Sequence, residues 1–155
     1  MRVSYSMTQF VLIVNRMERV KLYSMNECIV KLIFLYSSVY NIDPMISLSI
    51  AKVESNFNPN AIGKLGEIGL YQLRPEFVSD YSKEELFNIE NNISIGIRKL
   101  KEVKNNCYFK DKLNWLICYN YGYTNSKSVK YPEQFPYIKK VNKELVAFKK
   151  IYGNN

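Results

Sequence analysis

The chain has 155 residues, 47% of them hydrophobic, which suffices for one domain with a single core and leaves no room for a second catalytic module. It contains no histidine, which excludes Ser-His-Asp and Cys-His catalysis and zincin-type metal sites, so proton transfer must use carboxylates, tyrosine or lysine. The net charge of +8 indicates a polyanionic partner, such as nucleic acid, an anionic membrane or a bacterial wall, or else a lysine-rich solvated surface.

The N-terminal region lacks the pattern of a membrane anchor or a signal peptide. No stretch reaches the length of about 18 apolar residues that a membrane-spanning helix needs. The best early apolar run, residues 10–14, is too short for a secretory h-region, and no small-residue cleavage site follows it. We therefore expect no stable membrane insertion. We divide the chain into an N-terminal extension or first helix over residues 1–24 and one domain over residues 25–155.

Apolar residues recur at helical spacing along most of this domain. Asp43 followed by Pro44 is a strong helix start, and Ser82 with Glu85 forms a capping box for a short helix. The longer predicted helices cover residues 26–40, 44–54, 90–104, 113–121 and 136–152. Any β structure is confined to a small hairpin within residues 63–70. The sequence thus predicts a mainly α globule.

The cysteine pattern and the first helix give two further expectations. The chain has three cysteines, Cys28, Cys107 and Cys118. Their number is odd, and they show neither C-x-x-C spacing nor a nearby ligand of another type, which favours buried thiols over a structural disulfide. The helix over residues 26–40 is expected to have one broad apolar face that includes Cys28, Leu35 and Val39.

The most informative segment, residues 51–73, contains one carboxylate, Glu54, at the end of an apolar helix. A polar turn and a glycine-rich loop follow it and close on Gln72. A lone acid on an apolar helical face is costly to ionise, and the dipole at a helix C-terminus also disfavours the anion. We expect the pKa of Glu54 to rise into the range where the carboxyl can both donate and accept a proton, as a glycosidase acid must.

The same segment contains an E-S pair, then an aromatic residue and a proline, then G-x-x-G-L-x-Q. The residues of this pattern are Glu54, Ser55, Phe57, Pro59, Gly66, Gly69, Leu70 and Gln72. The pattern resembles the signature of the lytic transglycosylases of glycoside hydrolase family 23, the goose-type lysozyme-like group.

Three further elements resemble motifs of that family and follow in its order, so the resemblance extends over residues 42–141. Its N-I-x-x-G-x-x-Y-L element is matched by Asn92, Ile93, Gly96 and Leu100. Its A-Y-N-x-G element is matched by Tyr119, Asn120 and Gly122, and its late tyrosine motif by Tyr137, Ile138, Lys140 and Val141. The chain departs from the family where Lys99 replaces tyrosine and Cys118 replaces alanine, and the Glu-Thr pair that often precedes the late tyrosine is absent.

The resemblance implies a lysozyme-like helical fold and a peptidoglycan lytic transglycosylase. Glu54 would protonate the oxygen that links MurNAc to GlcNAc. It would then accept the proton of the MurNAc C6 hydroxyl, which attacks C1 and gives a 1,6-anhydro product. No cofactor and no metal would take part. The expected substrate-binding residues are Ser55, Gln72, Tyr119, Asn120, Tyr137 and Glu67.

Other functions remain open on the sequence. A muramidase of the same fold would use Glu67, or a positioned water, to complete hydrolysis, although Glu67 also fits an exposed loop acid. A virion or secretion component would grip glycan without cutting it, and a nucleic-acid-binding protein is supported by charge alone. We expect a monomer that binds peptidoglycan glycan strands, not nucleic acid, at the bacterial cell wall. The missing signal peptide points to phage delivery, as a virion component or as an endolysin released through a holin, with a non-standard export route as the alternative.

Overall fold

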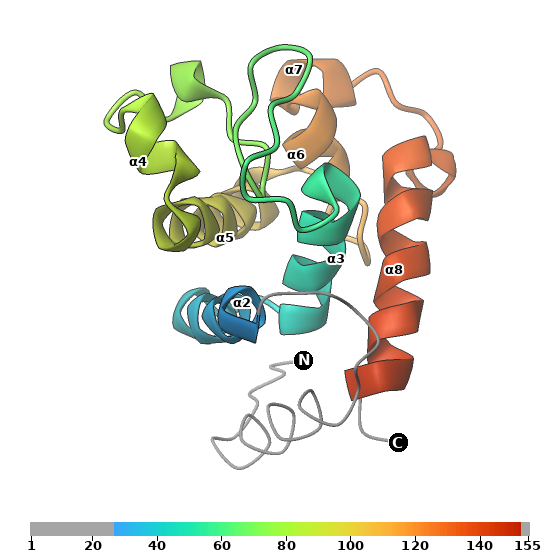
Figure 1. Ribbon diagram of the computed structural model, residues 1–155. Helices are drawn as coiled ribbons and strands as arrows, with labels where there is room; N and C mark the ends of the chain where they lie inside the picture. The colour runs from blue at the N-terminus through green and yellow to red at the C-terminus, as the bar shows by residue number, and fades with distance from the viewer. Residues whose placement is uncertain (1–26, 153–155) are drawn as a thin grey trace.

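The computed structural model describes residues 27–152, and helices dominate this part of the chain (Figure 1). The elements in chain order are α2 (Glu27–Tyr40), α3 (Pro44–Ser55), the 3-10 helix η1 (Pro75–Phe77), α4 (Lys83–Phe87), α5 (Ile89–Asn106), α6 (Leu116–Tyr121), α7 (Tyr123–Ser126), the 3-10 helix η2 (Pro132–Gln134) and α8 (Pro136–Tyr152). Within the described residues, β pairing is limited to isolated bridges of Ile68 with Ile62 and with Leu73. The mainly α prediction is confirmed. The predicted extension over residues 1–24 lies outside the described residues.

Helix α3 is the central element of the fold. It packs against α8 and α2, and Figure 1 shows α3 and α8 running side by side. Its start is capped as predicted, because the Met45 N–H donates to Asp43 Oδ1 at 2.8 Å. The side chains of Met45, Leu48 and Ile50 have no exposed surface, and each such burial stabilises the fold by roughly 1.5–3 kcal/mol. The last turn of α3, which carries Glu54, is therefore held in a fixed place.

Helices α4 and α5 also begin at caps that the local sequence encodes. The Glu85 N–H donates to Ser82 Oγ at 3.2 Å and the Ser82 N–H donates to Glu85 Oε2 at 2.7 Å, which confirms the predicted capping box. At the start of α5, the Asn91 N–H donates to Asn88 Oδ1 at 3.0 Å. The apolar residues that recur at helical spacing along α5 are buried: Ile93, Ile97, Leu100 and Val103.

A buried asparagine of α5 fastens the glycine-rich loop to the core. Asn92 Nδ2 donates to the carbonyl oxygens of Ile68 and Leu86, and Asn92 Oδ1 accepts the N–H of Tyr71 at 2.9 Å. Gly69 has a φ of +75°, and a Cβ there would lie 2.4 Å from Asn92 Nδ2. A Cβ on Gly96 would lie 2.4 Å from the Tyr71 ring. These two glycines thus let the loop approach α5 closely enough for Asn92 to bind it.

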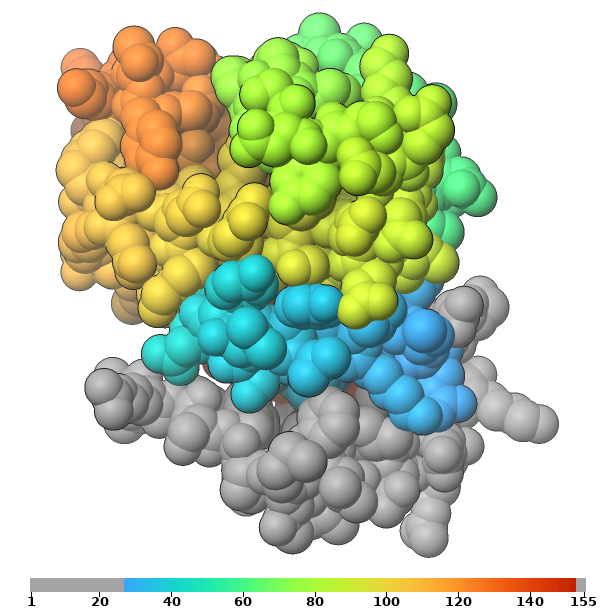
Figure 2. Space-filling model, turned by 90° about the vertical axis from the view of Figure 1, so that its left-hand side faces the viewer, coloured from blue at the N-terminus to red at the C-terminus, as the bar shows by residue number. Residues whose placement is uncertain are grey.

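Figure 2 views the molecule onto α2 and α5. Helix α5 lies between α2 below it and two upper lobes, one formed by residues 61–88 and the other by α7 and its neighbours. The glycine-rich loop is thus carried above α5 and α2 in this view. Across residues 27–152, no helix combines the length and the apolar character that crossing a bilayer requires.

The prediction of buried thiols is wrong for all three cysteines. Cys107 and Cys118 form a disulfide, with an S–S distance of 2.06 Å and a Cα–Cα distance of 6.0 Å. Cys107 follows the last residue of α5 and Cys118 lies in α6, so the packing of these two helices brings the thiols together. Neither sequence spacing nor residue type encodes this packing. Cys28 is exposed on α2, which also differs from the expected buried position.

Two other expectations are corrected by the fold. The buried face of α2 consists of Ile29, Val30, Ile33, Phe34 and Ser37. Leu35 and Val39 are instead 49% and 63% exposed, because α3 and α5 cover the opposite side of this nearly uniformly apolar helix. The helix predicted over residues 113–121 begins only at Leu116. Residues 113–115 form turns instead, closed by bonds three residues apart: the Leu116 N–H donates to the Leu113 carbonyl oxygen at 2.9 Å and the Ile117 N–H to that of Asn114 at 3.1 Å.

Candidate active site

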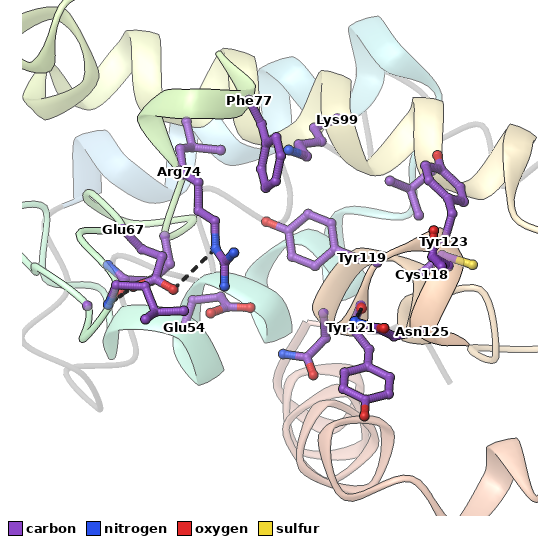
Figure 3. A pocket seen from close by; sticks show the side chains of 18 of the residues that line it. Glu54, Glu67, Arg74, Phe77, Lys99, Cys118, Tyr119, Tyr121, Tyr123 and Asn125 are labelled. Carbon is purple, nitrogen blue, oxygen red and sulfur yellow. Dashed lines mark hydrogen bonds and ion pairs between the residues drawn. The ribbon is translucent and has the colours of Figure 1, made fainter. Parts of the chain in front are cut away.

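A cleft of about 1150 Å³ opens between the glycine-rich loop, the wall made by η1 and α5, and the α6–α7 region (Figure 3). Five of the predicted site residues line it: Glu54, Glu67, Gln72, Tyr119 and Asn120. Ser55 and Tyr137, the other two, are not among the lining residues. In Figure 3, Glu54 and Glu67 lie on one side of the cleft and Tyr121 and Asn125 on the other, with Tyr119 between them.

Glu54 reaches the cleft because α3 ends directly after it. Asn56 and Phe57 both have positive φ, at +53° and +60°, so the helix cannot continue. The Asn56 N–H closes the last turn by donating to the Lys52 carbonyl oxygen at 2.9 Å. The aromatic ring of Phe57 then packs edge-on against Phe148 of α8, which fixes the direction in which the chain leaves the helix.

Burial raises the pKa of Glu54 from 4.5 to about 7, which confirms the direction expected from the sequence. The hydrogen bond from Tyr137 lowers this pKa, but burial outweighs it, and the negative charge of Glu67 adds to the rise. The Tyr137 hydroxyl donates to Glu54 Oε1 at 2.5 Å. A carboxyl with a pKa near 7 is populated in both protonation states at neutral pH, which suits proton donation followed by proton acceptance.

Tyr137 contacts Glu54 from the core side and is not among the residues that line the cleft. It lies in the first turn of α8 and is only 8% exposed. Burial raises the pKa of its hydroxyl well above the usual range, and the neighbouring Glu54 raises it further, so the phenol stays protonated and remains a donor. Because α8 packs along α3, the hydroxyl is held where it can orient one oxygen of the carboxyl.

Tyr119 lines the cleft beside Glu54 but uses its hydroxyl elsewhere. The hydroxyl donates to the carbonyl oxygen of Tyr71 at 3.0 Å, which fastens α6 to the glycine-rich loop. Burial raises the pKa of Tyr119 well above the usual range, and the negative charge of Glu54 adds to this effect. Asn120, the next residue, is exposed on the cleft lining.

Ser55 and Gln72 also fix the glycine-rich loop, through side-chain hydrogen bonds to its backbone carbonyl oxygens. Ser55 Oγ lies 3.0 Å from the carbonyl oxygens of both Ala51 and Leu70, so its hydroxyl ties the last turn of α3 to the loop. Gln72 has a φ of +46°, and its Nε2 donates to the Gly69 carbonyl oxygen at 2.9 Å. Gln72 also lines the cleft, whereas Ser55 acts on the backbone behind it.

Glu67 is set in an environment that keeps it charged. Its Oε2 accepts the Leu65 N–H at 2.9 Å, and its Oε1 lies 3.4 Å from Arg74 Nε, as the dashed line in Figure 3 marks. Burial raises the pKa of Glu67, but backbone hydrogen bonds and the Arg74 guanidinium outweigh it and hold the pKa below its usual range. The carboxylate thus closes the turn of the loop at the edge of the cleft.

Several cleft residues were not predicted from the sequence. They include Arg74, Phe77, Val103, Tyr121, Tyr123 and Asn125. None of them occupies a fixed position of a motif, since Tyr121 stands at the variable position of the A-Y-N-x-G element, so no local signal marks them as cleft residues. Lys99, also in the lining, did carry a signal, since it occupies a position where the resembled family has tyrosine. Residues 27–152 contain no group of three or more His, Cys, Asp or Glu side chains that could hold a metal ion.

Comparison with known proteins gives relatives at the level of sequence and of fold. Residues 31–141 match the family described as the transglycosylase SLT domain. Two strains of Klebsiella pneumoniae have an endo-type membrane-bound lytic murein transglycosylase A that is 32% identical over 79 residues, covering 44% of this chain and 39% of the relative. The chain thus spans well under half the length of these curated relatives.

Two solved structures share the fold. The 70 kDa soluble lytic transglycosylase of Escherichia coli superposes with a TM-score of 0.63 at 23% identity, over 78% of this chain and 23% of that one. An inactive mutant of the lytic transglycosylase Slt from Pseudomonas aeruginosa gives a TM-score of 0.71 at 15% identity, over 99% of this chain and 30% of that one. With the family match extending from α2 into α8, the chain belongs to the transglycosylase SLT domain family.

Proposed function

We propose that this protein is a lytic transglycosylase that cleaves the β-1,4 bond between MurNAc and GlcNAc in peptidoglycan. The observation that carries the proposal is the carboxyl of Glu54, which lines a large cleft, has a pKa of about 7 and accepts a hydrogen bond from Tyr137. The family match and relatives named as lytic murein transglycosylases support the same activity.

In the proposed reaction Glu54 acts first as an acid and then as a base. The protonated carboxyl gives its proton to the glycosidic oxygen, and the bond from this oxygen to C1 of MurNAc breaks. The resulting carboxylate takes the proton of the C6 hydroxyl as this oxygen bonds to C1. The product is a 1,6-anhydro sugar, and Glu54 ends protonated as it began. A pKa near 7 keeps both proton transfers close to balance at neutral pH.

We assign two kinds of supporting role to the other predicted residues. Gln72, Tyr119 and Asn120 line the cleft on opposite sides and are proposed to contact the glycan. Tyr137 and Ser55 are proposed to act through other groups: Tyr137 orients the carboxyl of Glu54, and Ser55 positions the loop that bears Gln72.

The place of action proposed for this protein is the bacterial cell wall, where its substrate lies. The Cys107–Cys118 disulfide supports an oxidising compartment outside the cytoplasm, because such bonds persist there and are rare inside it. Membership in glycoside hydrolase family 23, action as a phage endolysin or virion component, and the monomeric state stay predictions from the sequence.

A hydrolytic muramidase is the second candidate. Glu67 lines the same cleft as Glu54 and is held ionised, which is the state a general base for water needs. Against this role, both of its oxygens already accept from the loop backbone and from Arg74. A third possibility, a glycan-binding component without activity, has no observation in its favour, since loss of the acid is the simplest route to such a protein and Glu54 is present.

Digestion of purified sacculi, followed by mass spectrometry of the released muropeptides, tests the proposal. We expect products that are lighter by one water than hydrolysis products and that lack a reducible end, as the 1,6-anhydro ring requires. Products with a free reducing MurNAc would replace the transglycosylase by the muramidase. Binding to sacculi without any release would leave only the glycan-binding role.

A further inference from the structure

One wall of the cleft places two cations around an exposed aromatic ring. Lys99 Nζ lies 5.1 Å from the centroid of the Phe77 ring, and Arg74 Cζ lies 5.9 Å from the same centroid. Phe77 belongs to η1 and is 64% exposed, and Lys99 belongs to α5. Figure 3 shows Phe77 and Lys99 next to each other on the wall above Tyr119, with Arg74 extending from there toward Glu54.

The two cations differ in how their charge is balanced. Arg74 Nε lies 3.4 Å from Glu67 Oε1, and Arg74 Nη1 lies 4.0 Å from Glu76 Oε1, so two carboxylates balance the guanidinium charge. The ion pairs found among residues 27–152 do not include Lys99. Burial lowers the pKa of Lys99, Glu102 and Glu76 raise it at longer range, and Arg74 lowers it. Lys99 is therefore a half-buried ammonium group in the cleft lining for which the described part of the chain offers no carboxylate at contact distance.

A substrate anion would supply what this position lacks. The repeating sugars of peptidoglycan are neutral N-acetyl hexosamines, and the negative charge of the MurNAc unit is carried by carboxylates. These are the lactyl carboxylate where the stem peptide has been removed, or carboxylates of the stem peptide where it is present. We propose that Lys99, seated over Phe77 beside Arg74, binds a carboxylate of the muropeptide in the cleft. This inference rests on the proposed function and adds a determinant of substrate recognition to it.

The test compares wild-type protein with Lys99→Met, which keeps the apolar stem and removes the charge. The substrates are untreated sacculi and sacculi whose carboxylates have been converted to neutral amides with carbodiimide and ammonia. On untreated sacculi we expect Lys99→Met to raise KM about fivefold, the upper end for a partly exposed ion pair, with kcat changed less than about twofold. On amidated sacculi the two proteins should have the same KM. Lys99→Arg should retain the wild-type preference.

Lys104→Met is the matched control, since it removes the same charge from an exposed position on the same helix outside the cleft lining. It should behave as wild type on both substrates. Sacculi stripped of stems by an amidase identify the source of the carboxylate. If the Lys99 effect persists there, the lactyl carboxylate is bound, and if it disappears, a stem carboxylate is bound.

The inference is overturned if Lys99→Met has the wild-type KM on untreated sacculi, or if it raises KM equally on untreated and amidated sacculi. Co-sedimentation with both kinds of sacculi repeats the comparison without catalysis. A failure of the proposed function would instead show as a wild-type protein that releases no anhydro product, and the co-sedimentation comparison would still decide the role of Lys99.

Discussion

Two carboxyls line the same cleft, Glu54 at the end of α3 and Glu67 in the glycine-rich loop. Their surroundings shift their pKa values in opposite directions. Glu54 is attached to a buried helix, receives one phenolic hydrogen bond and has a pKa raised to about 7. Glu67 lies in a loop, accepts a backbone N–H, pairs with Arg74 and has a pKa below the usual range. The residue types are the same, so the environment alone separates a proton donor from a fixed anion.

This contrast teaches how one fold assigns roles to two acids. An apolar wall penalises charge, whereas backbone N–H groups and a guanidinium stabilise it. The two sites are also coupled, because the charge of Glu67 raises the pKa of Glu54. Glu67 thus helps to keep Glu54 protonated while it closes the loop.

The largest expected effect comes from Glu54→Gln. The amide keeps the shape and still accepts the Tyr137 hydrogen bond, but it cannot transfer a proton. Release of muropeptides from sacculi should fall by roughly 10²–10⁴-fold, the usual contribution of general acid–base catalysis. Circular dichroism should show an unchanged fold. Retention of more than about a tenth of the wild-type rate would remove Glu54 from the catalytic role.

The same variant should change how stability depends on pH. The folded-state pKa of Glu54, about 7, lies above the value of 4.5 that the group has when unfolded. The protonated carboxyl therefore favours folding below about pH 4.5, and this contribution is lost as pH rises through about 7. The total is on the order of 3 kcal/mol. As pH rises from 4.5 to about 7, the free energy of unfolding of the wild-type protein should fall relative to that of Glu54→Gln. Above about pH 7 the difference between the two proteins should stay constant.

Urea unfolding of both proteins at several pH values measures this difference directly. Carboxyls that do not interact with Glu54 titrate alike in the two proteins, so their contributions cancel in the comparison. Parallel stability curves from pH 4 to pH 8 would show that burial does not raise the pKa of Glu54, and the contrast with Glu67 would be lost.

Tyr137→Phe should have the next largest effect. It removes a hydrogen bond that favours the Glu54 anion, so the pKa of Glu54 should rise further and the alkaline limb of the pH–rate profile should move to higher pH. Turnover should fall about tenfold, in line with the loss of a hydrogen bond to a charged group.

Tyr119→Phe is the matched control, because its hydroxyl donates to the Tyr71 carbonyl oxygen instead of to Glu54. It should lower the free energy of unfolding by about 1 kcal/mol and leave the alkaline limb in place. If both variants shift the limb equally, the Tyr137 contact does not specifically control the protonation of Glu54.

The smallest effect is expected for Glu67→Gln. Turnover should change by less than about twofold, because the amide can still accept the Leu65 N–H and the lost ion pair with Arg74 is partly exposed. The alkaline limb should move slightly to lower pH, since the charge that raises the pKa of Glu54 is gone. Glu76→Gln, which removes the more distant carboxylate near Arg74, is the control and should leave the limb unchanged. Near-total inactivation by Glu67→Gln would favour the muramidase.

The features that were predicted correctly are those that depend on neighbours in the chain. The cap at Asp43 and the capping box at Ser82 involve residues two and three positions apart. The inward stripe of α5 follows from a strong 3.6-residue period. Such local signals fail for α2, where apolar residues surround most of the helix, so that only its packing against α3 and α5 selects the buried face.

Contacts between residues far apart in the chain were left open or predicted wrongly, because local sequence signals do not determine how the helices pack. Tyr119 and Tyr137 are equivalent as motif tyrosines, but only Tyr137 reaches Glu54, across a separation of 83 residues that α8 closes by packing on α3. The Cys107–Cys118 disulfide depends on how α5 meets α6. The ionised state of Glu67 depends on Arg74, which belongs to no motif.

By itself the sequence determined the helical fold, the order of its elements, the family resemblance and the position of one acid at the end of an apolar helix. Those properties come from periodicity, caps and residue order, which act over a few positions. The tertiary structure alone decided which tyrosine contacts Glu54, which acid stays ionised and which of the two cations on the cleft wall, Arg74 or Lys99, has no ion pair within residues 27–152. Those properties come from burial and from distances between side chains remote in the chain, and only the packed helices fix them.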